Sequence, residues 1–144
     1  MRARTDEDRG AYLLVLEMRT SRNIRVGALG ILGFEPGLYI YAGSALGSLG
    51  ARVRRHFAAG KTMHWHIDYL RQSSRPVEAL VLRGKEKMEC MLNEMVSSLE
   101  GARPYAPGFG CSDCSCTTHL HLVEDGTLRE LESYLPERLL PGPS

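Results

Sequence analysis

Apolar residues fall in short runs along the chain, separated by turns rich in glycine, serine and charged residues. The run at 11–18 is apolar and rich in strand-forming residues, which predicts a buried strand. Apolar residues alternate at 24–27, which predicts a second strand that forms a hairpin with the first. Further strands are expected at 38–43, 77–82 and 120–123. The strand at 38–43 ends at a glycine, where the backbone can approach another group closely.

Helical spacing begins after this third strand. The apolar stripe of the first predicted helix consists of Leu49, Val53 and Phe57. These residues lie four apart, as on one face of a helix, and Gly60 stands where a C-terminal cap is expected. Arg52 and His56 are also four residues apart and share the neighbouring stripe. The sequence therefore predicts a helix that presents one arginine and one histidine side by side.

The second half of the chain predicts a helical or mixed segment at 63–70, a helix at 84–99, a loop at 101–118 and a terminal helix at 127–140. The inward face of the 84–99 helix is expected to be Met88, Met91, Leu92, Met95 and Leu99. Strands with helices between and after them predict an α/β (α+β) fold, in which a small central sheet is covered by helices. A length of 144 residues fits one domain that spans 1–144.

The composition changes this picture little. Hydrophobic residues make up 43% and charged residues 24% of the chain, as in soluble globular proteins. No apolar run approaches the roughly 20 residues that cross a bilayer. The first ten residues carry both signs of charge and lack the apolar stretch of a signal peptide. We therefore expect a cytoplasmic protein with no membrane partner.

The distribution of charge is more informative than the net charge of +1. Residues 1–75 contain 12 Lys and Arg against 6 Asp and Glu, whereas residues 76–144 contain 6 against 11. A basic half could face a polyanion, because phosphate contacts dominate the affinity of proteins for nucleic acid. The alternative is that the two kinds of charge merely solvate two faces of the molecule.

Candidate chemistry lies at the end of the third strand and in the helix that follows it. Tyr41 and Gly43 place a phenol beside accessible backbone, and Arg52 and His56 follow on one side of the helix. A tyrosinate or a histidine can take a proton from water, and a guanidinium can neutralise charge that develops on a phosphate. Taken singly, a strand tyrosine is usually a packing residue, and an Arg/His pair on a helix is usually a solvated face.

The spacing of these residues resembles the signature of the GIY-YIG nuclease superfamily, which includes homing endonucleases and the N-terminal nuclease of bacterial excision repair. The resemblance rests on Gly10-Ala11-Tyr12, on Tyr41-Ala42-Gly43, and on the downstream Leu49, Arg52 and His56. Three further segments are similar to a branch of that superfamily that is best known from archaea and is sometimes joined to endonuclease III-like repair proteins. They are Ile24–Gly27, His64–Leu70 and Gly108–Leu120. The resemblance covers about residues 10–123, which makes 124–144 a C-terminal extension.

The resemblance implies a catalytic set of Tyr12, Tyr41, Arg52, His56 and Glu89. Either tyrosine would orient or deprotonate the attacking water, and Arg52 would hold the scissile phosphate. His56 would take the place of the second tyrosine or histidine that the family carries on this helix. The implied activity is that of an endonuclease, of repair or structure-specific type, that hydrolyses phosphodiester bonds in DNA.

The resemblance also implies a divalent cation, magnesium or manganese, bound by Glu89, with Glu86 and Glu94 as weaker candidates. The substrate-binding residues that it implies are Gly43, Ser44, Arg55, His64 and His66. Three differences from the family pattern are visible. Residues 19–37 are an insertion, Ser44 stands where many relatives carry lysine, and the late Pro-x-x-Asn of the family is missing.

A second group of metal-binding residue types lies late in the chain. Cys111, Cys114, Cys116 and His119 crowd into one loop, whereas Cys90 stands alone. Zinc takes four such ligands, and crowded cysteines in a cytoplasmic protein favour a metal or redox site over a disulfide framework. The alternative is that the cysteines are small packing residues and that the histidines bind neighbouring aspartates.

Three functions are therefore open from the sequence. The first is a metal-dependent endonuclease acting on DNA. The second is a non-catalytic module that binds nucleic acid through the same site. The third is a zinc-binding protein that uses the Cys/His loop and is unrelated to nucleic acid.

Overall fold

A central antiparallel sheet runs through the molecule in the computed structural model, which describes residues 8–60, 62–111 and 115–142. Within these residues the sheet has six strands in the order β6-β7-β4-β1-β5-β8. The strands are β1 (Gly10–Met18), β4 (Gly37–Ala45), β5 (Arg75–Arg83), β6 (Ala102–Pro104), β7 (Leu120–Val123) and β8 (Arg138–Leu139). Each is antiparallel to its neighbours. The predicted fold class, a small central sheet flanked by helices, is confirmed.

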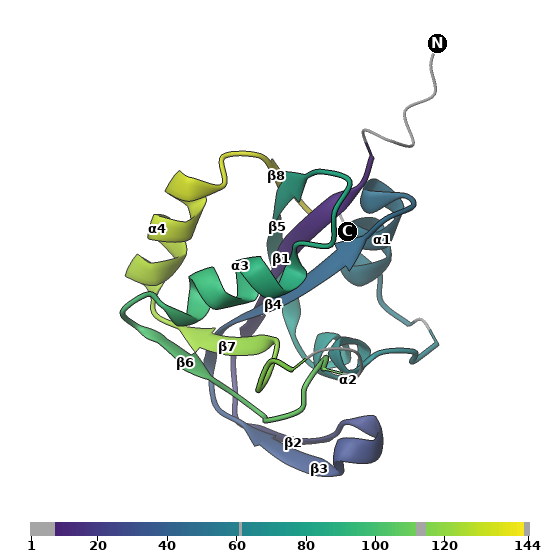
Figure 1. The fold of residues 1–144 in the computed structure, drawn as a ribbon. Helices are drawn as coiled ribbons and strands as arrows, with labels where there is room; N and C mark the ends of the chain where they lie inside the picture. Colours follow the sequence, from purple (N-terminus) through teal and green to yellow (C-terminus); the bar gives the residue numbers. More distant parts are fainter. Residues whose placement is uncertain (1–7, 61, 112–114, 143–144) are drawn as a thin grey trace.

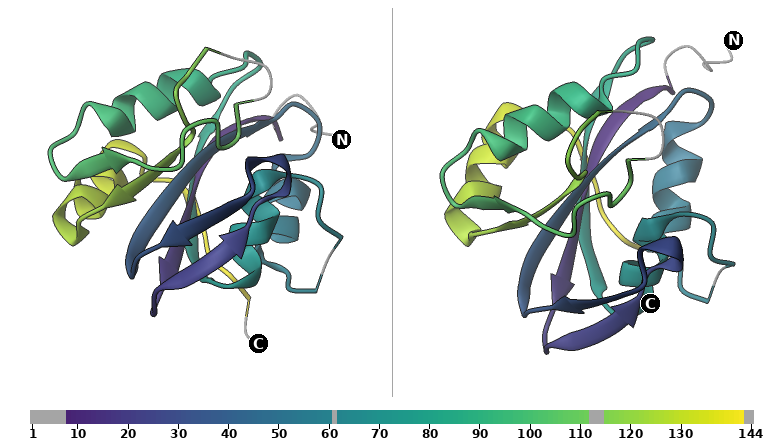
Figure 2. Two further views of the ribbon diagram at one scale, coloured as in Figure 1. Left: turned by 90° about the horizontal axis from the view of Figure 1, so that it is seen from below. Right: turned by 60° about the horizontal axis from the view of Figure 1, so that its bottom comes forward.

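Helices cover both faces of this sheet, so that the molecule has three layers (Figures 1 and 2). One face carries α1 (Leu49–Phe57), α2 (His66–Gln72) and a small separate hairpin of β2 (Arg22–Arg25) and β3 (Ile31–Phe34), which a short 3-10 helix (Gly27–Leu29) connects. The other face carries α3 (Glu89–Ser97) and α4 (Asp125–Tyr134).

The central strand β1 supplies side chains to both cores, because successive residues of a strand point to opposite faces. Tyr12, Leu14 and Leu16 join the core beneath α1 and α2. Ala11, Leu13 and Val15 join the core beneath α3 and α4. This double burial explains why the sequence of β1 is continuously apolar rather than alternating.

The first helix forms as its apolar spacing predicts. Leu49 and Val53 are fully buried, and the side chain of Ser48 caps the N-terminus by accepting a hydrogen bond from the Ala51 N–H. The helix ends at Phe57, and its C-cap is Ala58 rather than the predicted Gly60. His56 is fully buried, so the interpretation of the Arg/His stripe as a solvated face is wrong for this histidine.

The predicted hairpin between 11–18 and 24–27 is wrong. Both edges of β1 are occupied, by β4 on one side and β5 on the other, so β2 cannot pair with it. Instead, β2 pairs with β3 across the glycine-rich turn, with Ile24 opposite Leu32.

Three further expectations need correction. Met91, predicted to face inward, is 52% exposed, because the buried stripe of α3 is Leu92 and Val96 and the residue before Leu92 is turned about 100° around the helix axis. The expected loop at 101–118 contains β6, which pairs with β7. The expected helix at 127–140 covers only Asp125–Tyr134 in the structure, and β8 follows it at the edge of the sheet beside β5.

Leu128, Leu131 and Leu135 of the C-terminal region are buried in the core beneath α3 and α4. None of the helices among the described residues has the length and the apolar character that crossing a membrane requires.

Candidate active site

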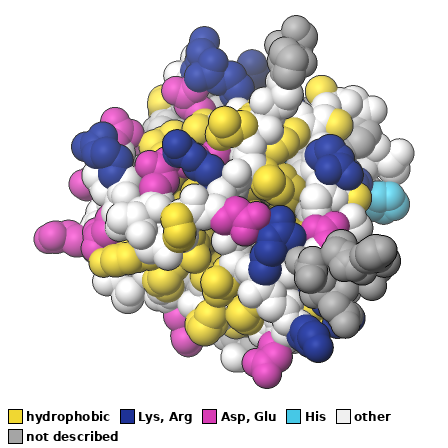
Figure 3. Space-filling view, turned by 90° about the horizontal axis from the view of Figure 1, so that it is seen from above, with side chains coloured by type: hydrophobic (Ala, Val, Ile, Leu, Met, Phe, Trp, Pro, Cys, Tyr) yellow, Lys and Arg dark blue, Asp and Glu magenta, His cyan; other side chains and the backbone are white. Residues whose placement is uncertain are grey.

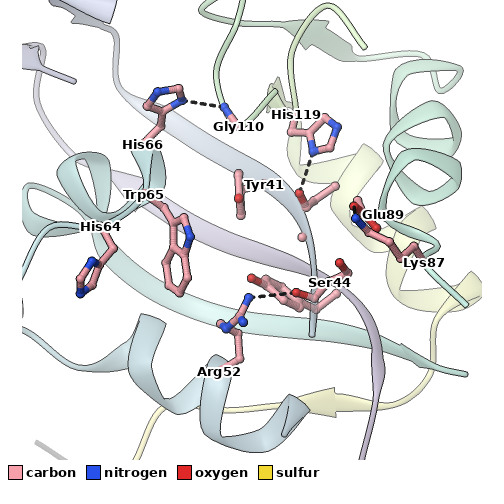
Figure 4. Close-up of a pocket in the computed structure, with 13 residues that line it drawn as sticks. Tyr41, Ser44, Arg52, His64, Trp65, His66, Lys87, Glu89, Gly110 and His119 are labelled. Atoms are coloured by element: carbon pink, nitrogen blue, oxygen red, sulfur yellow. Dashed lines mark hydrogen bonds and ion pairs between the residues drawn. The ribbon is translucent and has the colours of Figure 1, made fainter. Parts of the chain in front are cut away.

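A pocket of about 310 Å³ opens at the end of β4, where its pairing with β7 stops (Figure 4). β7 pairs with β4 only from Leu38 to Tyr41, so the segment 42–45 lies beyond that ladder. The pocket crosses this edge of the sheet. Tyr12, Tyr41 and Arg52 form its wall on the α1 side. Glu89, the first residue of α3, and Lys87, from the segment just before α3, form its wall on the other side.

Eight of the residues predicted as catalytic or substrate-binding line this pocket. They are Tyr12, Tyr41, Gly43, Ser44, Arg52, His64, His66 and Glu89. Two predicted residues, His56 and Arg55, do not line it. The weaker alternatives to Glu89, Glu86 and Glu94, are exposed and also lie outside the lining.

Tyr12 and His56 form a buried pair behind the pocket wall. The Tyr12 hydroxyl lies 2.7 Å from His56 Nε2, a short hydrogen-bond distance. Burial raises the pKa of Tyr12 well above its ordinary value, the neighbouring Tyr41 adds to this, and the Arg52 guanidinium opposes it. The phenol is therefore protonated at neutral pH. It can relay a proton to the imidazole more readily than it can exist as a tyrosinate.

The position of His56 is fixed by the next helix. Arg71 of α2 donates to the carbonyl oxygens of His56 at 2.9 Å and of Phe57 at 2.7 Å. These carbonyls belong to the last turn of α1, where backbone acceptors have no partner within the helix. Arg71 therefore locks the turn that carries the imidazole.

Gly43 allows β4 to pass directly beside the Tyr12 hydroxyl. A Cβ atom at this position would lie 2.5 Å from Tyr12 Oη, closer than real Cβ atoms approach other atoms. The residue faces Tyr12 in the register of β1 and β4. The glycine of the Tyr-x-Gly pattern is thus explained by close approach of the backbone to the phenol.

Tyr41 continues the aromatic wall from Tyr12 toward the loop before β7. Its ring centroid lies 6.5 Å from that of Tyr12 and 6.1 Å from that of Phe109. Burial raises the pKa of Tyr41 to about 12, with the Arg52 guanidinium opposing the shift. Tyr41 is therefore also a neutral phenol at the pH of a cell.

Arg52 extends from α1 along its wall of the pocket toward Ser44, as Figure 4 shows. Its Nη1 donates to the Ser44 carbonyl oxygen at 2.9 Å, and its guanidinium lies 4.7 Å from the centroid of the Trp65 ring. A guanidinium has five N–H donors, so the bond to Ser44 and the hydrogen bond to the Tyr12 hydroxyl leave further donors for an anion. Ser44 thus contributes a backbone carbonyl that orients the arginine.

Arg55 has a different role. Its guanidinium binds the Asp68 carboxylate in a two-bond geometry, at 2.9 and 3.2 Å, and also donates to the Thr62 carbonyl. Burial would raise the pKa of Asp68, but hydrogen bonds from Arg55 and from the N–H groups of His64 and Trp65 outweigh it and lower the pKa. Arg55 therefore anchors the start of α2 and does not face the pocket.

Glu89 is the acidic group of the pocket. Its Oε1 is buried and has no hydrogen-bond partner among the described residues, while its Oε2 lies 3.8 Å from Lys87 Nζ. Buried carboxylate oxygens are normally satisfied by a donor or a cation. The carboxylate therefore has the capacity to bind a cation beside the arginine wall.

The histidines differ in their surroundings. His64 is exposed in the lining, whereas His66 Nδ1 accepts a hydrogen bond from the Gly110 N–H at 2.8 Å and ties α2 to the loop before β7. Burial lowers the pKa of His66. His119 closes the pocket on the α3 side, and its Nδ1 lies 3.1 Å from the Ala42 carbonyl oxygen.

Sequence reasoning missed Trp65, Lys87 and Gly110 as lining residues. Trp65 carries a visible signal, since it is the single tryptophan of the chain and stands between two predicted histidines. The guanidinium groups of Arg52 and Arg55 lie over its ring, 4.7 and 4.5 Å from the ring centroid. Nothing in the sequence marks Gly110 as a pocket residue. It reaches the pocket only because the loop before β7 folds back toward Tyr41.

A group that could hold a metal ion lies against this pocket. It consists of Cys90, Cys116 and His119, whose ligand atoms all lie within 4.8 Å of one another. Of the ligands predicted from the loop, Cys116 and His119 are in the group. Cys111 instead donates from Sγ to the Phe109 carbonyl at 3.4 Å, and Cys114 lies outside the described residues. Cys90, which stands alone in the sequence, was missed.

One face of the molecule carries mixed charge. Figure 3 shows Lys and Arg side chains interspersed with Asp and Glu over the face seen from above. The basic side chains of the pocket are Arg52 and Lys87, one on each wall.

Comparison with protein families matches residues 11–138 to the model described as domain of unknown function DUF123. The comparisons with curated proteins and with solved structures give no match. The matched segment extends from the start of β1 into β8 and so includes every residue of the pocket. Since it spans most of the chain, the protein belongs to the DUF123 family.

Proposed function

We propose that this protein is a divalent-metal-dependent endonuclease that hydrolyses phosphodiester bonds in DNA. The observation that carries the proposal is the convergence of Tyr12, Tyr41, Arg52 and Glu89 on one pocket from four different elements. These residue types match what the GIY-YIG resemblance implies. A phosphodiester needs a positive group at the phosphate and a proton acceptor for water, and the pocket supplies both kinds of group.

Arg52 is the group that would hold the phosphate. The Ser44 carbonyl and the Trp65 ring restrain its guanidinium, so little side-chain entropy is lost when an anion binds. An oriented guanidinium can make two parallel bonds to phosphate oxygens and neutralise the charge that grows on them.

Tyr12 and His56 would handle the proton of the attacking water. With the His56 proton on Nδ1, Nε2 accepts the hydrogen bond from Tyr12, and the phenol oxygen can then accept a hydrogen bond from water. A proton that leaves water can pass to the phenol oxygen as the phenol proton passes to Nε2. This relay does not require a free tyrosinate, which the raised pKa of Tyr12 disfavours.

Glu89 would hold a magnesium or manganese ion. Its buried Oε1 without a hydrogen-bond partner among the described residues fits a hard cation, since such ions prefer carboxylate oxygen and retain water as their other ligands. When bound, the ion would stabilise negative charge on the phosphate and on the leaving oxygen.

Cleavage of labelled DNA tests the proposal. Duplex, nicked, flap and branched substrates are incubated with the protein and with magnesium or manganese. We expect cleavage of at least one structure, and we expect Arg52→Ala and Glu89→Gln each to lower its rate by about 100-fold or more. Neither substitution removes a core side chain, so both variants should keep the circular dichroism spectrum of the parent.

Matched controls are available on the same elements. Arg54→Ala removes an exposed guanidinium from α1, and Glu94→Gln removes an exposed carboxylate from α3. Both variants should cleave at the parental rate. If none of the substrates is cut, or if Arg52→Ala and Glu89→Gln cut as fast as these controls, the protein is not this nuclease.

A second candidate function, a non-catalytic module that binds nucleic acid, is favoured by Lys87. Its ammonium group lies 3.8 Å from Glu89 Oε2 and competes with a cation for that carboxylate. Salt-dependent binding of the same DNA panel without cleavage would favour the module over the nuclease.

A further inference from the structure

Two thiols and one imidazole from distant parts of the chain meet beside the pocket. Cys90 lies in the first turn of α3, whereas Cys116 and His119 lie in the segment that leads into β7. Cys90 Sγ lies 3.7 Å from His119 Nε2. We propose that these three side chains bind a zinc ion, or another divalent metal that prefers sulfur and nitrogen, separate from the hard cation assigned to Glu89.

The spacing of the donor atoms fits a shared ion. Zinc lies about 2.3 Å from thiolate sulfur and about 2.0–2.1 Å from imidazole nitrogen, so a tetrahedral site holds the two donors about 3.6 Å apart. The observed 3.7 Å between Cys90 and His119 is close to this value. The three donor atoms all lie within 4.8 Å of one another, so small side-chain rotations bring Cys116 to the same distance.

The imidazole is already oriented for this role. His119 Nδ1 lies 3.1 Å from the Ala42 carbonyl oxygen, which favours the tautomer that carries its proton on Nδ1 and directs the lone pair of Nε2 toward Cys90. The backbone of His119 makes two further bonds, to Phe109 at 2.8 Å and to Ala42 at 3.0 Å. The imidazole is therefore held in place by β4 and by the loop before β7.

Protein contacts also hold α3 against the segment before β7. Asn93 is 5% exposed, and its Nδ2 donates to the Thr118 carbonyl oxygen at 2.7 Å. Asn93 follows Cys90 by three residues, so both side chains lie on the same side of the helix. This bond brings the two cysteines together without the metal, so a single Cys→Ser variant should keep the fold.

The donor set selects the metal class. Two thiolates and one neutral imidazole suit zinc, whereas magnesium and calcium prefer oxygen ligands. His119 also lines the pocket, and Cys90 follows Glu89 in the chain. A bound ion would therefore link the start of α3, which carries Glu89, to the segment before β7, which carries His119. Both segments belong to the same wall of the pocket.

Metal content and cobalt spectra test this site without reference to nuclease activity. The protein is expressed with zinc in the medium, purified without chelators, and analysed by inductively coupled plasma mass spectrometry. We expect about one zinc per chain. After removal of zinc, titration with cobalt should give a near-ultraviolet thiolate-to-cobalt band that saturates at one ion per chain and that added zinc abolishes.

Cys90→Ser and Cys116→Ser should each lower the affinity for cobalt by at least about 100-fold and weaken the thiolate band. Cys111→Ser is the matched control, because its thiol lies in the same loop but bonds to the Phe109 carbonyl. That variant should bind one ion with parental affinity.

Two results would overturn this ligand set. One is wild-type protein, folded by circular dichroism, that takes up less than about half an ion of either metal per chain; the 3.7 Å contact is then only a thiol–imidazole hydrogen bond. The other is a loss of affinity in Cys111→Ser as large as that in Cys90→Ser.

Discussion

Gly43 sets how closely the backbone of β4 passes the Tyr12 hydroxyl, so the candidate site leaves no room for a side chain at this position. Substitution of Gly43 by alanine places a methyl group against that hydroxyl. We expect Tyr12 to move away from His56, with a loss of about 1–3 kcal/mol in the free energy of unfolding. Thermal unfolding measures the stability, and the histidine resonances in NMR spectra report the loss of the Tyr12–His56 hydrogen bond. The rate of DNA cleavage should fall when this hydrogen bond is lost.

Gly47→Ala is the control for this prediction. A Cβ atom at Gly47 would meet nothing within 4 Å, and the glycine lies in the same chain segment. Its variant should unfold like the parent. Equal stability and equal histidine spectra in Gly43→Ala would show that the close approach to Tyr12 has no consequence.

For single residues, the sequence predicted which side chains meet in the pocket better than it predicted which partner each charged side chain binds. Tyr12, Tyr41, Arg52 and Glu89 were predicted as a set and do line one pocket. Arg55 was predicted to bind substrate, but its charge is used by the buried Asp68, which lies 13 residues further along the chain. Such long-range pairing is invisible to a pattern along the chain.

Among the elements, β5 carries an unusual buried acid that makes stability depend on pH. Glu78 is 2% exposed; its Oε1 accepts a hydrogen bond from Arg138 of β8, while Glu132 of α4 lies next to Arg138. Burial, together with the Glu132 carboxylate, raises the pKa of Glu78 from 4.5 to about 7. The folded state therefore favours the neutral acid.

The sign of the effect follows from this raised pKa. The contribution of neutral Glu78 to stability is fully present below about pH 4.5 and is lost as the pH rises through 7. Glu78→Gln keeps a neutral side chain at every pH. We expect the variant to gain about 1–2 kcal/mol in the free energy of unfolding relative to the parent between pH 5 and pH 8. Urea unfolding at several pH values measures this difference.

Glu130→Gln on α4 is the control, because Glu130 is exposed and its carboxylate accepts a hydrogen bond from the hydroxyl of the exposed Tyr134 in the same helix. Its difference from the parent should not change with pH. A difference between Glu78→Gln and the parent that is equally constant would contradict the raised pKa.

The elements themselves were predicted where one pattern decides them. β1, β4, α1 and β7 follow from apolar runs and from four-residue spacing, because these patterns match the faces that the layers bury. β8 has two residues and forms only because β5 offers it an edge. The partner of β2 was mispredicted for a related reason, since strand pairing depends on which edges other strands have already occupied.

Across the whole molecule, charge is the property that bears on a nucleic-acid partner. On the face drawn in Figure 3, Lys and Arg side chains are interspersed with Asp and Glu, so this face shows no single basic surface. Binding of DNA should therefore depend on a few phosphate contacts. We expect Arg52→Ala to reduce the slope of log affinity against log salt by about 0.9, the value for one phosphate contact.

Fluorescence anisotropy of labelled DNA between 50 and 200 mM salt measures this slope, with EDTA present to prevent cleavage. Arg129→Ala is the control, since it removes an exposed guanidinium from α4 in the acidic half of the chain. An unchanged slope in Arg52→Ala would exclude this arginine as a phosphate contact.

The pocket straddles the edge of β4 beyond its ladder with β7, and this placement has a mechanical consequence. Arg52 and Glu89 belong to layers on opposite faces of the sheet, so the two walls cannot approach each other without bending its central strands. Closure of the two walls around a ligand therefore has a high free-energy cost, and the distance between the walls is already set in the folded chain. The pocket should therefore discriminate among ligands by how well their shape fits its fixed walls. Inhibitors that match the distance between the two walls should bind without inducing a new conformation.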